Sequence, residues 1–70
     1  MKIVFNGQAF ELNQACTLGD VLSDNLYTNG VPVEQAVVAV NQKLIHKSDY
    51  QTRVLQDGDQ IEMLTAVVGG

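Results

Sequence analysis

The sequence contains very few residues that build covalent or metal-centred sites. Its 70 residues include one cysteine, so no internal disulfide and no cysteine-based zinc or iron-sulfur site can form from this chain alone. This cysteine usage is typical of a reducing compartment. Free cysteine usually behaves as a small buried hydrophobe, which favours that interpretation of Cys16 over a sulfur-relay thiol. The single histidine, His46, has no neighbouring ligand in the sequence and is interpreted as a solvated loop residue.

Positive charge and long apolar runs are also scarce. Four Lys and Arg residues stand against eight Asp and Glu residues, which gives a formal net charge of −4. Nucleic acid is therefore a poor partner, because phosphate binding needs a cationic face. The apolar run near the N-terminus is too short for a signal-peptide core or a membrane span. We therefore expect no membrane partner and a cytoplasmic location.

Catalytic patterns are missing as well. The chain has no nucleophile paired with a base, no phosphate-cradling glycine loop and no cluster of metal ligands in sequence. Asp57 and Asp59 flank Gly58, but Asp in such a turn usually makes local backbone hydrogen bonds. We therefore predict that the protein is not an enzyme and binds no cofactor of its own.

Strand signals are present near the N-terminus and again from residue 36 onwards. Asn6-Gly7 separates two short apolar runs and supplies the positive φ values that a two-residue hairpin turn requires. The β-branched run 36–40 predicts a well-buried strand, and 43–45 predicts a short edge strand after the Asn41-Gln42 turn. The last predicted strand spans 60–66.

Helix signals lie between these strands. Thr17 can cap the first amides of a helix, and Asp20 places a carboxylate near its positive end. The helical stripe expected to face the sheet consists of Leu18, Val21, Leu22 and Leu26. Asn29-Gly30 and Pro32 predict where the helix ends.

The order strand, strand, helix, strand, short strand, strand predicts an α+β protein with the ubiquitin-like β-grasp fold. In this fold a mixed sheet of four to five strands wraps one main helix. We expect the strand after the helix to run parallel to a neighbour through a right-handed crossover. The predicted domain spans 1–66, and residues 67–70 form a flexible tail that ends in Gly69-Gly70.

Alternation along the strands predicts a docking surface. If the helix covers one face of the sheet, the residues of opposite parity form an exposed apolar patch that leads into the tail. This predicted docking patch consists of Val4, Val37, Ala39, Leu64 and Ala66. Cover by loops or by a second copy of the chain is the competing interpretation.

A set of short sequence pieces, in order along the whole chain, resembles the ThiS family of thiamine-biosynthesis sulfur carriers. The matching pieces are Lys2-Ile3, Asn6-Gly7, Thr17-Leu18, Val21-Leu22, Ala39-Val40-Asn41, Leu55, Asp57-Gly58-Asp59, Ile61-Glu62, Ala66-Val67 and Gly69-Gly70. No single piece is specific, but their order and the chain length together indicate the family.

The resemblance implies a sulfur-transfer cycle. An E1-like adenylating enzyme (ThiF-like) uses ATP and magnesium to activate the Gly70 carboxylate. Sulfur that originates from a cysteine desulfurase then forms a thiocarboxylate, which thiazole synthase (ThiG-like) consumes. Val67, Val68 and Gly69 would thread into the partner, because glycine approaches closely with no Cβ to collide.

Three other functions stay open at this point. The small subunit of molybdopterin synthase resembles this chain in fold and in its thiocarboxylated diglycine. A ubiquitin-like protein modifier shares the adenylate but passes its carbonyl to a lysine amine. An interaction domain with an inert tail is the third alternative.

Overall fold

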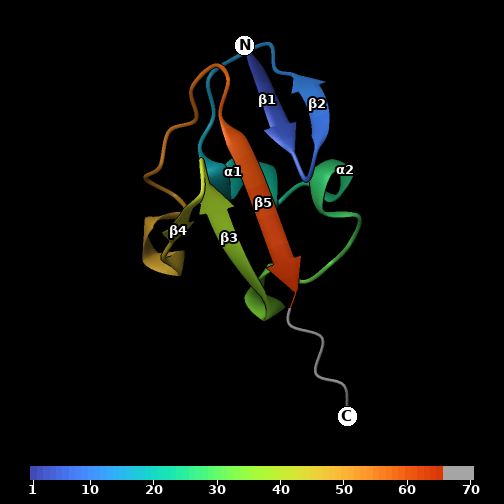
Figure 1. Ribbon diagram of the computed structural model, residues 1–70, viewed down its shortest axis with the longest axis vertical. Coiled ribbons are helices and arrows are strands. Elements are labelled where there is room, and N and C mark those ends of the chain that lie inside the picture. The colour runs from blue at the N-terminus through green and yellow to red at the C-terminus, as the bar shows by residue number, and fades with distance from the viewer. Residues whose placement is uncertain (66–70) are drawn as a thin grey trace.

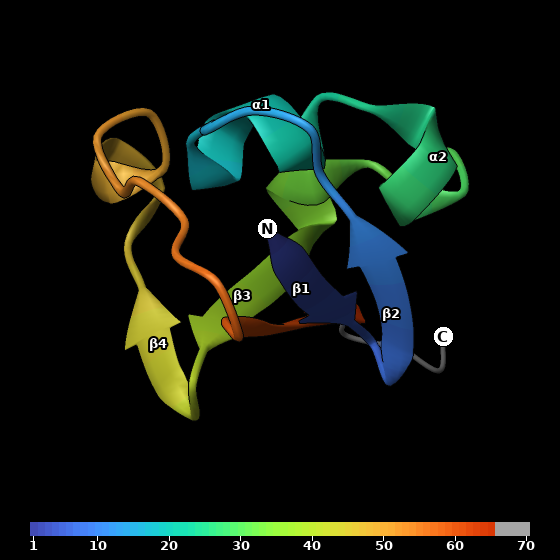
Figure 2. The ribbon, with the colours of Figure 1, turned by 90° about the horizontal axis from the view of Figure 1, so that it is seen from above.

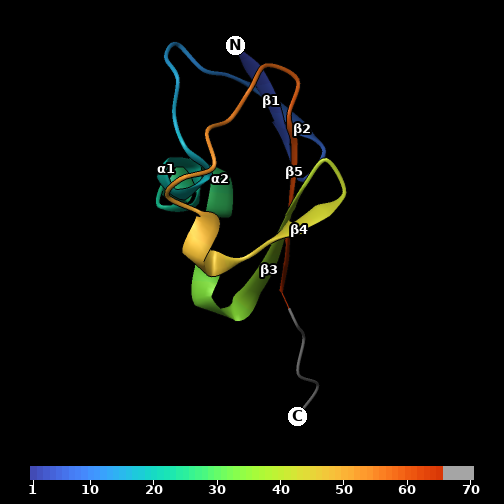
Figure 3. The ribbon, with the colours of Figure 1, turned by 90° about the vertical axis from the view of Figure 1, so that its left-hand side faces the viewer.

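The computed structural model describes residues 1–65, and in them five strands form one mixed sheet (Figure 1). The strands are β1 (Lys2–Phe5), β2 (Gln8–Glu11), β3 (Ala36–Val40), β4 (Lys43–Ile45) and β5 (Gln60–Thr65), arranged in the order β2-β1-β5-β3-β4. Two short helices, α1 (Leu18–Leu22) and α2 (Asn25–Thr28), lie on one face of the sheet (Figures 2 and 3). Short 3-10 turns span Val33–Gln35 and Lys47–Asp49. The α+β prediction is confirmed.

The N-terminal hairpin forms as the sequence predicts. Asn6 has a φ of 50° and Gly7 a φ of 84°, as a tight hairpin turn with two positive φ values requires. The register places Ile3 opposite Phe10 and thus points both side chains to the helix side of the sheet. There the Phe10 ring packs edge to face on Tyr27, with ring centroids 4.8 Å apart.

The predicted single helix is replaced by two. Thr17 begins α1 with a full capping box, in which its hydroxyl accepts from the Asp20 amide and the Asp20 carboxylate accepts from the Thr17 amide. At the C-terminal end of α1 the Ser23 hydroxyl donates to the Gly19 carbonyl. Asp24 then caps a new helix by accepting from the Leu26 amide.

This break overturns the predicted position of Leu26. Its side chain is 64% exposed, whereas Leu18, Val21 and Leu22 are buried as expected. The physical reason is local, because Asp24 satisfies the amides of a second helix start and the break rotates Leu26 off the apolar stripe. The second helix ends at Asn29, whose φ of 55° gives the left-handed cap.

The parallel strand pair is β1 with β5, in the register Val4 to Gln60 and Phe5 to Ile61. The strand after the helices, β3, is antiparallel to both of its neighbours, β4 and β5, so the predicted parallel neighbour is wrong. β5, the parallel partner of β1, inserts between β1 and β3, so both neighbours of β3 are antiparallel to it. The last strand therefore occupies the middle of the sheet.

The core lies between the sheet and the helices. Its fully buried side chains include Ile3, Leu18, Val38, Val40 and Ile61. The other predicted strands are confirmed, with β4 at an edge and β5 beginning at Gln60. In the described part of the chain no helix is long and apolar enough to cross a membrane. β5 ends at Thr65, at the opposite end of the sheet from the N-terminus (Figure 1).

Candidate functional site

The face of the sheet opposite α1 and α2, called here the outer face, carries exposed apolar side chains. Alternation on β3 explains their position, because Val38 points into the core and Val37 points outward. Val38 is 1% exposed and Val37 is 54% exposed, although the two residues are identical and adjacent. The outer face therefore leaves apolar side chains in contact with water in the folded chain.

Three exposed residues and one half-buried alanine form a continuous outer patch, which consists of Val37, Ala39, Leu44 and Leu64. Val37 and Leu64 lie directly opposite each other in the antiparallel β3–β5 pair, and Leu64 is 57% exposed. Ala39 pairs with Leu44 on β4, and Leu44 is 73% exposed. Cross-strand neighbours at these positions are in side-chain contact range, so the four side chains form one surface.

Charged residues border the outer patch on two sides. Glu62, opposite Ala39 on β5, is exposed. On the other side a small hollow is lined by Val37 and Leu44 together with His46 and Lys47. The Lys47 ammonium donates to the Glu34 carbonyl at 3.1 Å. An apolar centre with a polar rim is the composition of protein-protein interfaces.

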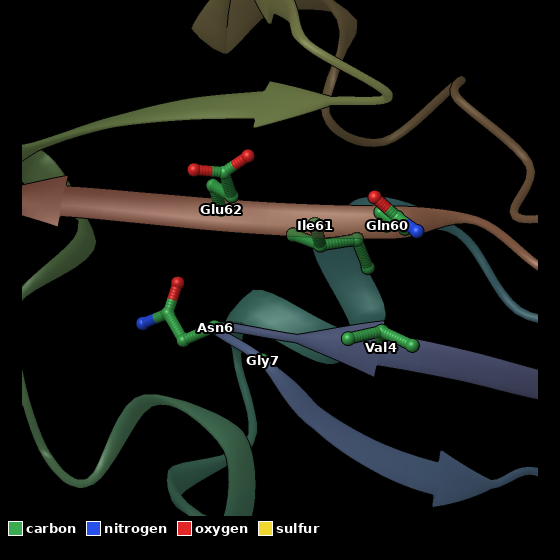
Figure 4. Close-up of a pocket in the computed structure, with 6 residues that line it drawn as sticks. All are labelled: Val4, Asn6, Gly7, Gln60, Ile61 and Glu62. Atoms are coloured by element: carbon green, nitrogen blue, oxygen red, sulfur yellow. The ribbon is translucent and has the colours of Figure 1, made fainter.

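The structure separates Val4 from the other predicted docking residues. Val4 is half-buried and pairs with Gln60, so the outward positions Gln60 and Glu62 separate it along β5 from Leu64. It lines a different hollow, at the end of β1, with Asn6, Gly7, Gln60, Ile61 and Glu62 (Figure 4). Of the predicted docking patch, Val37, Ala39 and Leu64 lie together, and Ala66 lies outside the described residues.

Leu44 is the outer-patch residue that the sequence prediction missed. Its only signal was its place between Lys43 and Ile45 in an edge strand of three residues. The predicted tail residues, Val67, Val68, Gly69 and Gly70, also lie outside the described residues. The outer patch nevertheless reaches Leu64, next to the residue at which the described part of β5 ends.

The other residues singled out in the sequence are Cys16, Asp59 and His46. Burial, and secondly the negative charge of Asp20, raise the pKa of the Cys16 thiol, which leaves little thiolate at neutral pH. Asp59 accepts from the Gln56 amide at 2.8 Å and from the Asn41 side chain at 3.0 Å, in agreement with a turn role. His46 is exposed. Within residues 1–65 no three His, Cys, Asp or Glu side chains gather in a way that would hold a metal ion.

Comparisons with known proteins agree on one family. The sequence model of the ThiS family matches residues 3–70. The sulfur carrier protein ThiS of Escherichia coli (strain K12) is 30% identical over 70 residues, and the match covers 100% of both chains.

Two solved structures share the fold. The crystal structure of the thiamine biosynthesis protein (ThiS) from Geobacter metallireducens superposes with a TM-score of 0.81 at 21% identity, covering 100% of each chain. A solution structure of a thiamine biosynthesis protein from the same organism gives a TM-score of 0.72 at 22% identity, covering 100% of this chain and 88% of that one. These superpositions confirm the β-grasp fold.

Proposed function

The chain belongs to the ThiS family, and on that premise we propose that it carries sulfur for thiamine biosynthesis on the carboxyl group of Gly70. The observation that carries this proposal is the family match, which runs through the diglycine to residue 70. The protein is then a co-substrate of its partners and performs no catalysis itself. It binds no cofactor, since the ATP and magnesium belong to the adenylating partner.

The chemistry requires activation before sulfur can enter. A free carboxylate resists nucleophilic attack, because its charge weakens the carbonyl as an electrophile and oxide is a very poor leaving group. In the proposed cycle a Gly70 carboxylate oxygen attacks the α-phosphorus of ATP, and pyrophosphate leaves. The outer sulfur of a cysteine desulfurase persulfide then attacks the acyl carbon, and AMP departs with that oxygen. A thiol reductant cleaves the sulfur-sulfur bond of the resulting acyl disulfide, which frees the Gly70 thiocarboxylate while the thiol is oxidised to a disulfide. The partner's magnesium neutralises the phosphate charge.

The last two residues suit this step for steric reasons. The terminal carboxylate must reach the α-phosphate inside the partner, and glycine has no Cβ to collide with the walls of a narrow channel. Alignment of the carboxylate with the phosphate is a proximity effect of up to about 7 to 11 kcal/mol. A side chain at Gly70 would crowd the carbonyl under attack.

The outer patch fits the docking part of the cycle. Its apolar side chains border the end of β5, so a partner that covers Leu64 also approaches the residues that follow it. The E1-like enzyme and the thiazole synthase would use this surface in turn, because each must receive the same terminal group. We place the cycle in the cytoplasm.

The proposal is tested by intact mass spectrometry of the chain after incubation with ATP, magnesium, an E1-like adenylating enzyme, a cysteine desulfurase with cysteine, and a thiol reductant. We expect one oxygen to be replaced by sulfur, with the change located at Gly70. A chain that lacks Gly70 is the control and should stay unmodified. Adducts with lysine amines in place of the thiocarboxylate would overturn the proposal in favour of a protein modifier.

A further inference from the structure

The side chain of Asn6 continues the β1–β5 ladder beyond the end of β1. The Asn6 backbone amide donates to the Ile61 carbonyl at 2.9 Å, as a strand residue would. The Asn6 Oδ1 then accepts from the Met63 amide at 2.8 Å, and Nδ2 donates to the Met63 carbonyl at 3.5 Å. One side chain therefore pairs both backbone groups of Met63. At this point the turn at Asn6 and Gly7 has already carried the backbone away from β5 (Figure 4).

Within residues 1–65, the Asn6 contacts with Met63 mark the last point along β5 at which hydrogen bonds join it to the β1 side of the sheet. Beyond Met63, β5 is paired only with β3, in the register Leu64 to Val37 and Thr65 to Ala36. A strand paired on one side has more freedom to twist and bend than one paired on both sides.

We infer that Asn6 is a positioning residue, whose paired contacts with Met63 hold the end of β5 from which the chain continues to Gly70. This inference rests on the proposed function, because it concerns delivery of the Gly70 carboxylate to the adenylating partner. Without the Asn6 amide group, two backbone groups of the largely buried Met63 lose their partners. The end of β5 is then anchored by β3 alone. Small displacements of a reacting group are costly in rate when alignment supplies much of the catalysis.

A simpler role for Asn6 would be its positive φ, which Asn tolerates better than most residues. Asn6→Gly separates the two roles, because glycine keeps the turn and removes the amide group. Asn6→Asp keeps the size and one acceptor, but it places a carboxylate against the Met63 carbonyl oxygen. Asn29→Gly is the matched control, since Asn29 also has a positive φ, of 55°, and is exposed.

The experiment measures two quantities on the full chain. The first is hydrogen exchange at individual backbone amides by NMR. The second is adenylation by an E1-like enzyme, with kcat and the KM for the carrier determined separately. In Asn6→Gly we expect the Met63 amide to exchange about tenfold faster, as expected for the loss of one hydrogen bond of about 1.4 kcal/mol. The Val4 amide, which donates to the Asp59 carbonyl, should keep its protection.

The kinetic result decides between a positioning role and a structural one. We expect kcat to fall about tenfold or more at unchanged KM in Asn6→Gly, because docking through the outer patch persists while alignment is lost. Asn6→Asp should lower kcat less than Asn6→Gly, because it keeps the acceptor for the Met63 amide and loses only the donor to the Met63 carbonyl. Asn29→Gly should match the wild type. An unchanged kcat in folded Asn6→Gly overturns the inference, whereas a wild-type chain that is never adenylated overturns the proposed function.

Discussion

The two faces of the sheet are built from the same kinds of residue but serve different ends. On the inner face Val38 and Ile61 are 1% exposed, while on the outer face Val37 and Leu64 are more than half exposed. The period of two along each strand produces this division, so each strand contributes to both surfaces. The inner face stabilises the fold, and the outer face is free to bind. The division is sharpest at the adjacent pair Val37 and Val38.

The largest expected effect is a difference in stability between a variant at Val38 on the inner face and a variant at Val37 on the outer face. Val38→Ala should lower the free energy of unfolding by about 2 to 3 kcal/mol, because two buried methyl groups and their packing are lost. Val37→Ala should cost about 0.5 kcal/mol or less, since its side chain is largely in water. Urea unfolding followed by circular dichroism measures both values. Equal losses would contradict the division between the faces.

The second prediction concerns binding through the outer patch. Leu64→Glu places a charge within a surface that a partner must desolvate, and should weaken affinity for the adenylating enzyme about tenfold or more. Stability should change little. The control is Ala9→Glu, which adds the same charge to an exposed outward position on β2, away from the patch. Isothermal titration calorimetry gives the affinities, and equal losses in both variants would remove the patch from the interface.

A third, smaller effect is expected from the cap of α1, the helix that covers part of the inner face. Thr17→Ala removes the hydroxyl that caps α1 and should lower the free energy of unfolding by about 1 kcal/mol. Because α1 contributes Leu18, Val21 and Leu22 to the core, the loss should appear in global unfolding. Ser48→Ala, which removes an exposed hydroxyl in the 3-10 turn Lys47–Asp49, is the control and should be close to neutral. The denaturant midpoints of the two variants provide the test.

The smallest expected effect is a loss of stability at alkaline pH that arises from a tyrosine buried in the core. Burial raises the pKa of the Tyr50 phenol above its ordinary value. As the pH rises, the unfolded chain therefore loses the phenol proton at a lower pH than the folded chain does. The contribution of the protonated Tyr50 to the free energy of unfolding is complete below about pH 10 and is lost as the pH rises through the folded pKa. Tyr50→Phe should show a shallower decline in denaturant midpoint between neutral and strongly alkaline pH. An identical decline would assign the effect to other groups, of which Cys16 and Tyr27 also have raised pKa values.

Features specified by neighbouring residues were predictable from the sequence. The Asn6-Gly7 turn, the Thr17 cap and the alternation on β3 each depend on chemistry within a few residues, and all three are confirmed. The helix break was missed because two local signals compete there. The spacing of Leu26 fits a continuous helix, but Asp24 caps a new one, and the cap prevails.

Features that depend on distant pairing were not predictable in the same way. The insertion of β5 between β1 and β3 has no signal in either strand alone, which is why the parallel pair was assigned wrongly. The Asn6 contact with Met63 joins residues 57 positions apart. Leu44 lies in a strand too short for its alternation to indicate a face. The role of the tail rests on chemistry and family membership, since its residues lie outside the described structure.

The central place of β5 also bears on when the chain can fold. Until β5 is available, the sheet consists of two separate hairpins, β1–β2 and β3–β4, and isolated hairpins are at best marginally stable in water. Folding on the ribosome must therefore wait for the last strand to emerge. A chain that ends before β5 has no assembled sheet to offer a partner, so copies terminated there would not compete with longer chains for a protein that binds the outer patch.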